Sequence, residues 1–517
     1  MALFTTIQIL LVLLLASTVA FLWRRHVSRL SLPPGPKGSF LTGVKDQLPP
    51  SAPWKKYATW AEHFRTNILY FRLYNKDFVV LNDHTAVHDL LNSRAGIYSD
   101  RPKAWMFFEL CAREKAVFNI SATNPRHSQY RRLLNTRLNS QAMKDMYEVL
   151  EDESEKMVKG MASSPVDYEK YIRRSIMEPI RNSVAVIMKV AYGYEVASEN
   201  DHFINVAEEC AKISGWAMAP GRWLVDYYPI LRFLPSWLPF TGFQRQAEEW
   251  KKRLASLSDE PHQWVKSQMR SEEYRESFTS KLLNPEGGGA VSEAQEDLIK
   301  WSAGGLYVGA TDTTISAMIS FMLLMALHPE AQNKAQAEID RVVGSHPRLP
   351  EVTELHHLHY LHAMMKEVLR YAPVANIALP HRVIRDDEYK GYRIPKDATV
   401  IANVWAIMHD PELYPNPSKF DPERFVGEQI NSRRKIETDA TVNINPDPTL
   451  FAFGFGRRSC PGIRFTETSL LLCMARILAR FIIHLPPVSG VPAKVEFTSG
   501  ITSHIKPFDI QIRPRVF

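Results

Sequence analysis

One stretch near the C-terminal end constrains this chain more than any other. From Phe451 to Gly462 it reads Phe-Ala-Phe-Gly-Phe-Gly-Arg-Arg-Ser-Cys-Pro-Gly, and an apolar run with helical character follows from Ile463 to Ile483. A thiol at the N-terminus of a helix, with cations beside it, has its pKa lowered toward the thiolate, the form that binds metals. The sequence therefore predicts a loop that presents the thiolate of Cys460 at the start of a helix.

The residues around this cysteine indicate what kind of metal site it serves. Gly454 and Gly456 allow tight turns and a close approach of the backbone to a flat ligand. Arg457 and Arg458 can bind anionic groups at the edge of that ligand. A thiolate beside a cradle for an acidic macrocycle is typical of thiolate-ligated haem. The alternative is that Cys460 is a small buried hydrophobic residue, as most lone cysteines are.

The spacing Phe-x-x-Gly-x-Arg-x-Cys-x-Gly resembles the haem-binding loop of the cytochrome P450 superfamily. This resemblance implies that Cys460 ligates the iron of haem b, and that Phe453, Gly454 and Arg458 contact the cofactor. It also implies a cytochrome P450 fold, mainly α with a minor β-sheet, in a single haem-binding catalytic domain.

Composition agrees with an ordinary globular protein that contains a large core. The chain has 517 residues, of which 45% are hydrophobic and 23% are charged. Its 4 cysteines are too few for a disulfide scaffold and favour a reducing compartment. A net charge of +7 fits a negatively charged partner or an anionic membrane surface. It is too dilute for a nucleic-acid-binding protein, so we expect no nucleic-acid partner.

The N-terminal segment predicts a membrane anchor. Residues 1–23 contain no charge and are long enough to span a bilayer as a helix. A cleaved signal peptide is the alternative, but no basic residue precedes the apolar run. Arg24 and Arg25 follow it, which places that flank in the cytosol.

We expect a transmembrane signal anchor at 1–23, a basic and proline-rich linker at 24–45, and the monooxygenase domain at 46–517. The similarity to microsomal family members implies a single-pass protein of the endoplasmic reticulum membrane with its catalytic domain in the cytosol.

Hydrophobic periodicity predicts a few strands and many helices. Strands are expected at Ile68–Leu73 and Phe78–Leu81, and strand-like segments near Val383–Ile401 and Val495–Ile512. Helices are expected at Tyr130–Gly160, Arg173–Ala191, Trp264–Leu283 and Ala290–Leu327.

A second motif, Gly-Ala-Thr-Asp-Thr-Thr, begins at Gly309 on the last of these helices. Gly305, Gly309 and Thr313 share one helix face, which is either a groove for a ligand or a stripe for close helix packing. The motif resembles the superfamily's oxygen-binding sequence. On that resemblance Thr313 contacts dioxygen, Asp312 helps to deliver protons, and Gly309 and Ala310 lie against the haem. Ala310 departs from the usual glycine, and its methyl group narrows the groove.

A third motif, Glu367-Val-Leu-Arg370, places a carboxylate and a guanidinium on one helix face. Such a pair is usually solvated and contributes little. The superfamily's Glu-x-x-Arg motif matches here, and Arg424 stands where its third partner is expected. The resemblance implies a buried structural triad.

Contacts to the haem propionates are implied by two further segments. His381 lies before a strand pattern at the position of a propionate ligand, and Arg131 matches the arginine of the family's Trp-x-x-x-Arg segment. His127 replaces that tryptophan, and its imidazole can also donate a hydrogen bond. A satisfied core or surface histidine is the alternative for His381. Arg126, Arg132 and Arg137 near this helix are either solvated or form a face for an acidic reductase.

The substrate pocket has no chemical signature of its own. By resemblance it would be lined by apolar or small side chains, which implies a lipophilic substrate. These residues are Trp105, Phe107, Phe108, Leu306, Ile377, Ala378 and Ile501. The aromatic stretch from Trp223 to Phe243 either packs in the core or borders a membrane-facing entrance.

Together these motifs are similar to those of fungal members, in particular the O-methylsterigmatocystin oxidoreductase-like group. The resemblance implies a monooxygenase that uses O2 and electrons from NADPH, passed on by NADPH–cytochrome P450 reductase. It would oxidise a lipophilic small molecule in secondary metabolism, for example a terpenoid or polyketide. The alternatives are a reductase-independent thiolate-haem isomerase or dehydratase, and a non-catalytic haem-binding sensor.

Overall fold

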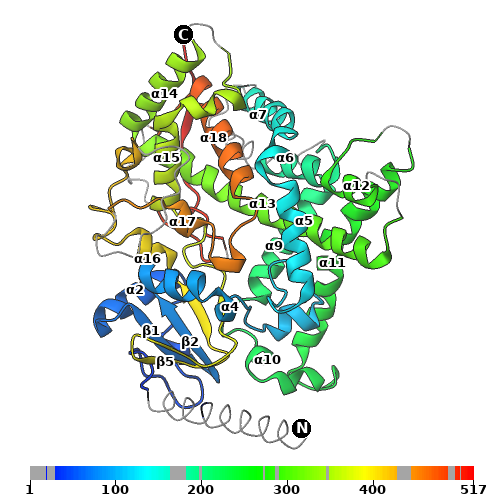
Figure 1. The fold of residues 1–517 in the computed structure, drawn as a ribbon, viewed down its shortest axis with the longest axis vertical. Coiled ribbons are helices and arrows are strands. Elements are labelled where there is room, and N and C mark those ends of the chain that lie inside the picture. The colour runs from blue at the N-terminus through cyan, green and yellow to red at the C-terminus, as the bar shows by residue number, and fades with distance from the viewer. Residues whose placement is uncertain are drawn as a thin grey trace, which may run out of the picture.

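The computed structural model describes residues 19, 30–162, 182–196, 201–271, 274–285, 290–344, 348–427, 444–486, 495–500 and 502–516. It shows a mainly helical body with a small sheet at one end, which confirms the predicted fold class (Figure 1). The predicted anchor at 1–23 lies outside the described residues, apart from Val19.

The main sheet has the strand order β1-β2-β6-β3. β1 (Ile68–Leu73) and β2 (Lys76–Leu81) form an antiparallel hairpin, as expected for these segments. β6 (Thr399–Ala402) pairs in parallel with β2 and is buried along its whole length, which suits its β-branched residues. β3 (His381–Arg382) pairs with β6 at the edge of the sheet, where His381 is buried. Two smaller sheets pair β4 (Asp387–Tyr389) with β5 (Tyr392–Ile394), and β7 (Phe481–His484) with β8 (Gln511–Pro514).

The helical body is built around α13 (Glu293–Leu327). It packs against α5 (Pro125–Arg137), α11 (Gly242–Gln268), α12 (Phe278–Leu283), α15 (His359–Tyr371) and α18 (Ile463–Arg480). Ser292 and Gln295 form a capping box that fixes its start close to the expected residue Ala290. Among the described residues, α13 alone is long and apolar enough to cross a membrane. Most of that apolar stretch is buried inside the protein, so α13 is a core helix.

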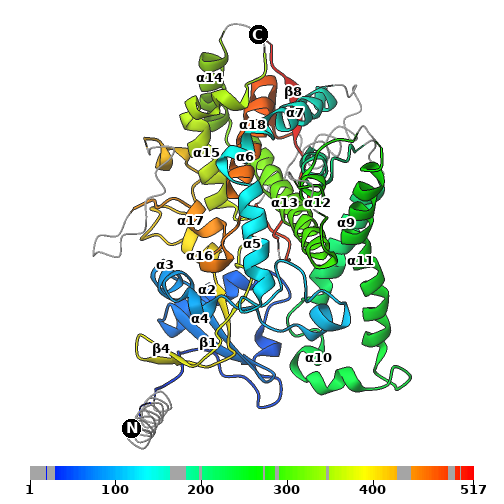
Figure 2. The same cartoon turned by 45° about the vertical axis from the view of Figure 1, so that its right-hand side comes forward.

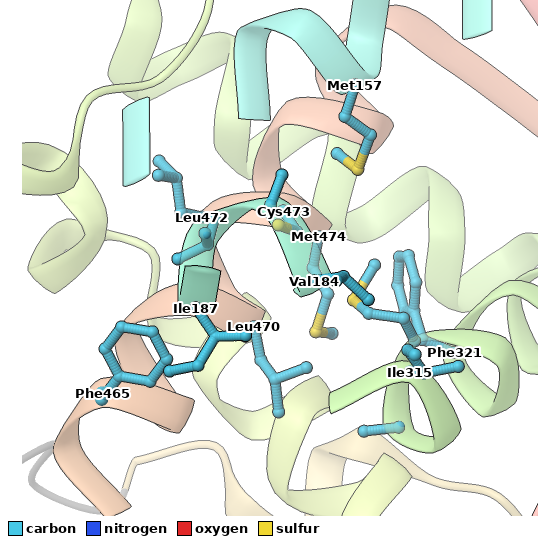
Figure 3. Packing of buried hydrophobic residues seen from close by; sticks show 14 of the residues in the cluster. Met157, Val184, Ile187, Ile315, Phe321, Phe465, Leu470, Leu472, Cys473 and Met474 are labelled. Carbon is cyan, nitrogen blue, oxygen red and sulfur yellow. The ribbon is translucent and has the colours of Figure 1, made fainter. Parts of the chain in front are cut away.

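Helix α18 (Ile463–Arg480), which follows the cysteine loop, is held by a large apolar core. Figure 3 shows its side chains beside Met157 of α7 (Tyr147–Ala162), residues of the helical segment 182–192, and Phe321 of α13. Because α18 is buried along much of its length, the loop that precedes it has a fixed position.

Two expected helices are interrupted in the structure. The segment Tyr130–Gly160 is divided into α5 (Pro125–Arg137), α6 (Ser140–Lys144) and α7, because the Asn139 side chain caps a new helix. The segment Trp264–Leu283 contains the end of α11 (Gly242–Gln268) and then α12 (Phe278–Leu283). Of the expected helix Arg173–Ala191, the described part begins at residue 182 and is helical.

The remaining helices complete the body and cover the sheet, as Figures 1 and 2 show. They are α2 (Pro53–Phe64), α3 (His84–Val87), α4 (Ala95–Tyr98), α9 (His202–Ala217), α10 (Leu224–Tyr227), α14 (Pro329–Val343), α15 (His359–Tyr371), α16 (Val404–Met408) and α17 (Thr449–Ala452). Short 3-10 or π turns occur at Lys45–Gln47, His88–Ser93, Met106–Leu110, Pro229–Phe233, Val352–His357, Pro422–Phe425 and Gly456–Arg458.

Candidate active site

The cysteine loop connects α17 to α18 in a compact turn. The backbone N–H of Cys460 donates to the carbonyl of Phe453 over 2.7 Å. Gly456 has a φ of +53°, and a Cβ there would lie 2.2 Å from the carbonyl oxygen of Leu91. Its N–H donates to the Asn92 side chain over 2.7 Å. Glycine is therefore required at 456 because the loop packs closely against the segment that contains Leu91 and Asn92. The close approach predicted for this glycine is thus to protein rather than to a flat ligand.

Cys460 differs from the other cysteines in its accessibility. All four cysteines lie in the part of the chain that the structure describes, and only the side chain of Cys460 is exposed. Desolvation by the surrounding protein raises the pKa of its thiol, against the opposing effects of the Gly462 N–H and the charge of Arg131. The expected lowering of the pKa is therefore wrong for the polypeptide alone. A coordinated metal deprotonates a thiol outright, so the metal itself would supply the missing stabilisation.

Three arginines from distant segments hold the loop and the strands beside it. Arg131 on α5 donates to the carbonyl of Ser459 over 2.5 Å. Arg458 donates to the carbonyls of Ser99 (2.7 Å) and Ile120 (2.5 Å). Arg101 donates to the carbonyls of residues 379 and 380 over 2.8 and 2.7 Å. No sequence signal distinguishes Arg101, because these two partners lie more than 270 residues away.

Two buried histidines lie in the electrostatic field of these arginines. Burial, followed by the charges of Arg458 and Arg131, lowers the pKa of His127 to about 4. Burial and the charge of Arg101 lower the pKa of His381 to about 3, although its Nδ1 contacts the carbonyl of Tyr98 at 2.8 Å. The structure thus brings the predicted residues His127, Arg131, His381 and Arg458 into one electrostatic cluster.

The arginines of this cluster also repel one another. Burial and the charge of Arg458 lower the pKa of Arg101 to about 9, and burial lowers that of Arg458 to about 10, with a further contribution from Arg131. Asp100 offsets this repulsion only in part. An anionic ligand among these side chains would relieve it. The donor set therefore fits a haem, whose carboxylates would meet the cations while its iron meets the exposed thiol of Cys460.

The face of α13 that carries the Gly-Ala-Thr-Asp-Thr-Thr motif is partly filled by protein. A Cβ at Gly305 would lie 2.7 Å from Val117, and one at Gly309 would lie 2.9 Å from Phe118. The packing interpretation of the glycine stripe therefore holds at both positions. The Thr313 hydroxyl donates to the carbonyl of Gly309 over 2.7 Å, within the turn expected to handle dioxygen.

The Asp312 carboxylate is bound by two residues from the C-terminal part of the chain, a contact that the sequence did not predict. Nε2 of His504 lies 3.0 Å from one carboxylate oxygen, and the Thr502 hydroxyl donates to the other. Burial alone would raise the pKa of Asp312, but the hydrogen bond and charge of His504 outweigh it and lower the pKa. His504 carries no local motif, so only the fold reveals this contact.

The predicted buried triad is confirmed. Arg370 donates to both oxygens of Glu367 over 2.7 and 2.8 Å, and both side chains are fully buried. Arg424 lies 3.5 Å from the same carboxylate and donates to the carbonyls of Pro415 and Asn416. The triad joins α15 to the segment at 415–425.

Two surface predictions are refined by the structure. Arg126 pairs with Asp297 at 2.9 Å and with the hydroxyl of Tyr130, so its charge is already engaged, whereas Arg132 is exposed. The aromatic stretch at 223–243 is divided: Val225 and Tyr227 are buried, but Trp237 and Phe240 are 77% and 99% exposed. Core packing alone therefore does not describe this stretch.

Comparisons with known proteins agree with this geometry. The model of the family described as "Cytochrome P450" matches residues 33–512. "Cytochrome P450 monooxygenase claR" of Ampulloclitocybe clavipes is 34% identical over 95% of this chain and 87% of its own length. "Tryptamine 4-monooxygenase" of Psilocybe cyanescens is 34% identical over 98% of both chains.

Among solved structures, a zebra fish cytochrome P450 with abiraterone has the same fold, with a TM-score of 0.67 and 20% identity. It covers 90% of this chain and 100% of its own. The protein described here is thus a monooxygenase of the fungal type that binds haem through a cysteine thiolate, and it belongs to the cytochrome P450 family.

Proposed function

We propose that this monooxygenase oxidises a lipophilic small molecule in fungal secondary metabolism, with Cys460 as its haem ligand and with electrons from NADPH delivered by NADPH–cytochrome P450 reductase. One observation carries the assignment of the ligand. Cys460 is the exposed cysteine, and it lies at the start of α18 beside a cluster of arginines and buried histidines. Cys111, Cys210 and Cys473 are buried and unsuited to this role.

The chain's own residues have distinct tasks at this site. Haem b supplies the activation of dioxygen when it is bound. Arg131, Arg458, His127 and His381 would hold its carboxylates, and Phe453 and Gly454 would support it beside Cys460. On the α13 side, the backbone at Gly309 and Ala310 would lie against the cofactor, with the ring of Phe118 packed beside Gly309. The Thr313 hydroxyl and the Asp312 carboxylate, adjacent on α13, hold and pass protons there.

The expected pocket residues favour a substrate with few charges. Trp105, Phe107, Phe108, Leu306 and Ala378 are all apolar and buried or half-buried, and Ile501 lies outside the described residues. A relative named tryptamine 4-monooxygenase, and others named as monooxygenases of fungi, support a small-molecule substrate. Apolar side chains around a pocket exclude water, and a lipophilic molecule binds there because its apolar surface is removed from water.

We also propose that the protein is anchored in the endoplasmic reticulum membrane by residues 1–23, with the linker at 24–45 and the catalytic domain at 46–517 in the cytosol. An exposed apolar patch supports contact with the bilayer. It consists of Phe40, Leu41, Ile230, Phe233, Trp237 and Phe240. Exposed aromatic and aliphatic side chains gathered on a surface are typical of membrane contact. The elements that carry them lie near β1 and α10, at the lower end of the molecule in Figure 1.

Reconstitution tests this function. The full-length protein, co-expressed with its neighbouring biosynthetic genes and a reductase, should yield a product that carries one oxygen atom from labelled dioxygen. Product formation should require both NADPH and the reductase. Turnover of a peroxide without reductase would instead identify an isomerase or dehydratase. Haem binding with no turnover in any metabolite extract would favour a sensor.

A further inference from the structure

The Asp312 carboxylate is held at both oxygens by one short segment of the chain. The Thr502 hydroxyl donates to Oδ2, and Nε2 of His504 lies 3.0 Å from Oδ1. These partners come from residues almost two hundred positions further along the chain, so the contact joins α13 to the C-terminal part of the protein. A carboxylate with both oxygens bound has one fixed orientation.

The segment that supplies these partners is itself fixed by backbone hydrogen bonds. Thr498 and His504 pair through N–H to carbonyl (2.7 Å), and the N–H of Ser503 donates to the carbonyl of Val374 over 2.8 Å. The hydroxyl of Ser316, one turn after Asp312 on α13, donates to the carbonyl of Ser503 over 2.8 Å. None of these bonds uses the His504 ring, so replacing that ring leaves the backbone of the segment in place.

We propose that His504 is the positioning residue for Asp312, setting the orientation in which this carboxylate handles protons. The proposal rests on the proton-handling role assigned to Asp312 above. His504 does not itself contact the reacting atoms in this account, and it acts through the carboxylate that it holds. Asp312 is more than one third exposed at its side chain, so without such a partner it would be free to rotate toward solvent.

Among the described charged groups near His504, Asp312 is the one that contacts its imidazole ring. On its own segment, Lys506 pairs with Glu496 at 2.8 Å, so these two charges neutralise each other. On α13, Asp312 is the acidic group in contact with the imidazole among the described residues. Lys506→Gln is therefore a matched control, since it removes an ion pair from the same segment without touching Asp312.

A double-mutant cycle on the haem-loaded, full-length protein tests the contact without any turnover. The variants are Asp312→Asn, His504→Leu and the double variant, and the measurement is the Tm. If His504 holds Asp312, the double variant loses no more Tm than the worse single variant. Additive losses of Tm would show that the two side chains act independently and would overturn the proposal.

A second measurement separates positioning from general structural support. NADPH oxidation by the reconstituted enzyme, followed in H2O and D2O, reports proton handling and needs no identified substrate. We expect His504→Leu to slow it roughly tenfold and to change the solvent isotope effect as Asp312→Asn does. His504→Gln, which keeps a donor, should recover most of the rate, and Lys506→Gln should match the wild type.

The outcomes distinguish this inference from the function on which it rests. A wild-type rate in His504→Leu together with a slow Asp312→Asn would overturn the positioning role. The same would follow if His504→Gln were as slow as His504→Leu. A wild-type rate in Asp312→Asn would instead remove the proton-handling role from Asp312, and the Tm cycle would still decide whether His504 holds it.

Discussion

Arg131 on α5 donates a hydrogen bond of 2.5 Å to the carbonyl of Ser459, the residue directly before Cys460. This contact ties a helix from the first third of the chain to the loop that presents the thiol. Arg458, in the same loop, points to carbonyls at 99 and 120. The cysteine loop is thus held from several directions by charged donors, whose repulsion an acidic cofactor would relieve.

Removing one of these charges should loosen the cofactor. Arg458→Gln should speed haem loss at least about tenfold, because a charge-assisted hydrogen bond contributes about 1.5–3 kcal/mol. Transfer of haem to apomyoglobin measures the rate. Arg132→Gln, at an exposed position of α5, is the control and should leave the rate unchanged. Equal rates in both variants would contradict the proposed role of Arg458.

The buried triad should matter far more than a surface ion pair nearby. Glu367→Gln removes the charge that two arginines share, which should cost about 3–5 kcal/mol of unfolding free energy and reduce the yield of haem-loaded protein. Lys334 and Glu423 form an exposed pair at 2.6 Å, so Lys334→Gln should cost less than about 1 kcal/mol. Denaturant titration compares the two variants, and similar losses would argue against a structural triad.

A half-buried histidine beside the triad should make the fold sensitive to acid. Burial, then the charge of Arg370, lowers the pKa of His409 to about 4, although its Nδ1 contacts the carbonyl of Trp405. The unfolded chain binds this proton near pH 6.5 and the folded protein does not, so stability is lost as the pH falls below about 6.5. Between pH 7 and pH 5 the loss should be about 2 kcal/mol.

His409→Gln should remove this part of the acid sensitivity, measured as the unfolding free energy at the two pH values. His63→Gln, at an exposed histidine, serves as the control. An unchanged pH dependence in His409→Gln would contradict the assignment of a neutral imidazole at this position.

The exposed aromatic patch predicts membrane binding without the anchor. A chain shortened to residues 30–517 should still bind vesicles of zwitterionic phospholipid. In this shortened chain, the double variant Trp237→Ser, Phe240→Ser should bind the vesicles at least tenfold more weakly, since each ring contributes about 1.5–3 kcal/mol when buried. Val516→Ser is a matched control, because Val516 is 98% exposed and lies next to the C-terminus, at the opposite end of the molecule in Figure 1. Sedimentation with vesicles measures the difference, and equal binding by all three proteins would rule out the patch.

The features that the sequence predicts correctly depend on residues close together in the chain. The alternating apolar residues of β1 and β2, the long periodic run of α13 and the glutamate–arginine spacing of the triad each depend on residues a few positions apart. The divisions between α5, α6 and α7 were missed because Asn139, a capping residue, lies within a continuous apolar pattern.

The contacts of Arg101 and of Asp312 with His504 could not be predicted, because their partners come from segments that only the fold brings together. The choice between a ligand groove and close packing at Gly305 and Gly309 also depended on the fold, since Val117 and Phe118 pack there from another part of the chain. Local composition identifies a site of this kind, whereas tertiary contacts determine which side chains orient its catalytic groups.

The central claim is that Cys460 supplies a thiolate to haem iron, and the carbon monoxide difference spectrum of the reduced protein tests it most directly. The wild type should show the red-shifted Soret band of a thiolate-ligated haem, and Cys460→His should keep the haem but lose that band. Cys473 is a buried cysteine within α18, and Cys473→Ser should retain the red-shifted band. Absence of the band in the wild type, or its persistence in Cys460→His, would contradict the account.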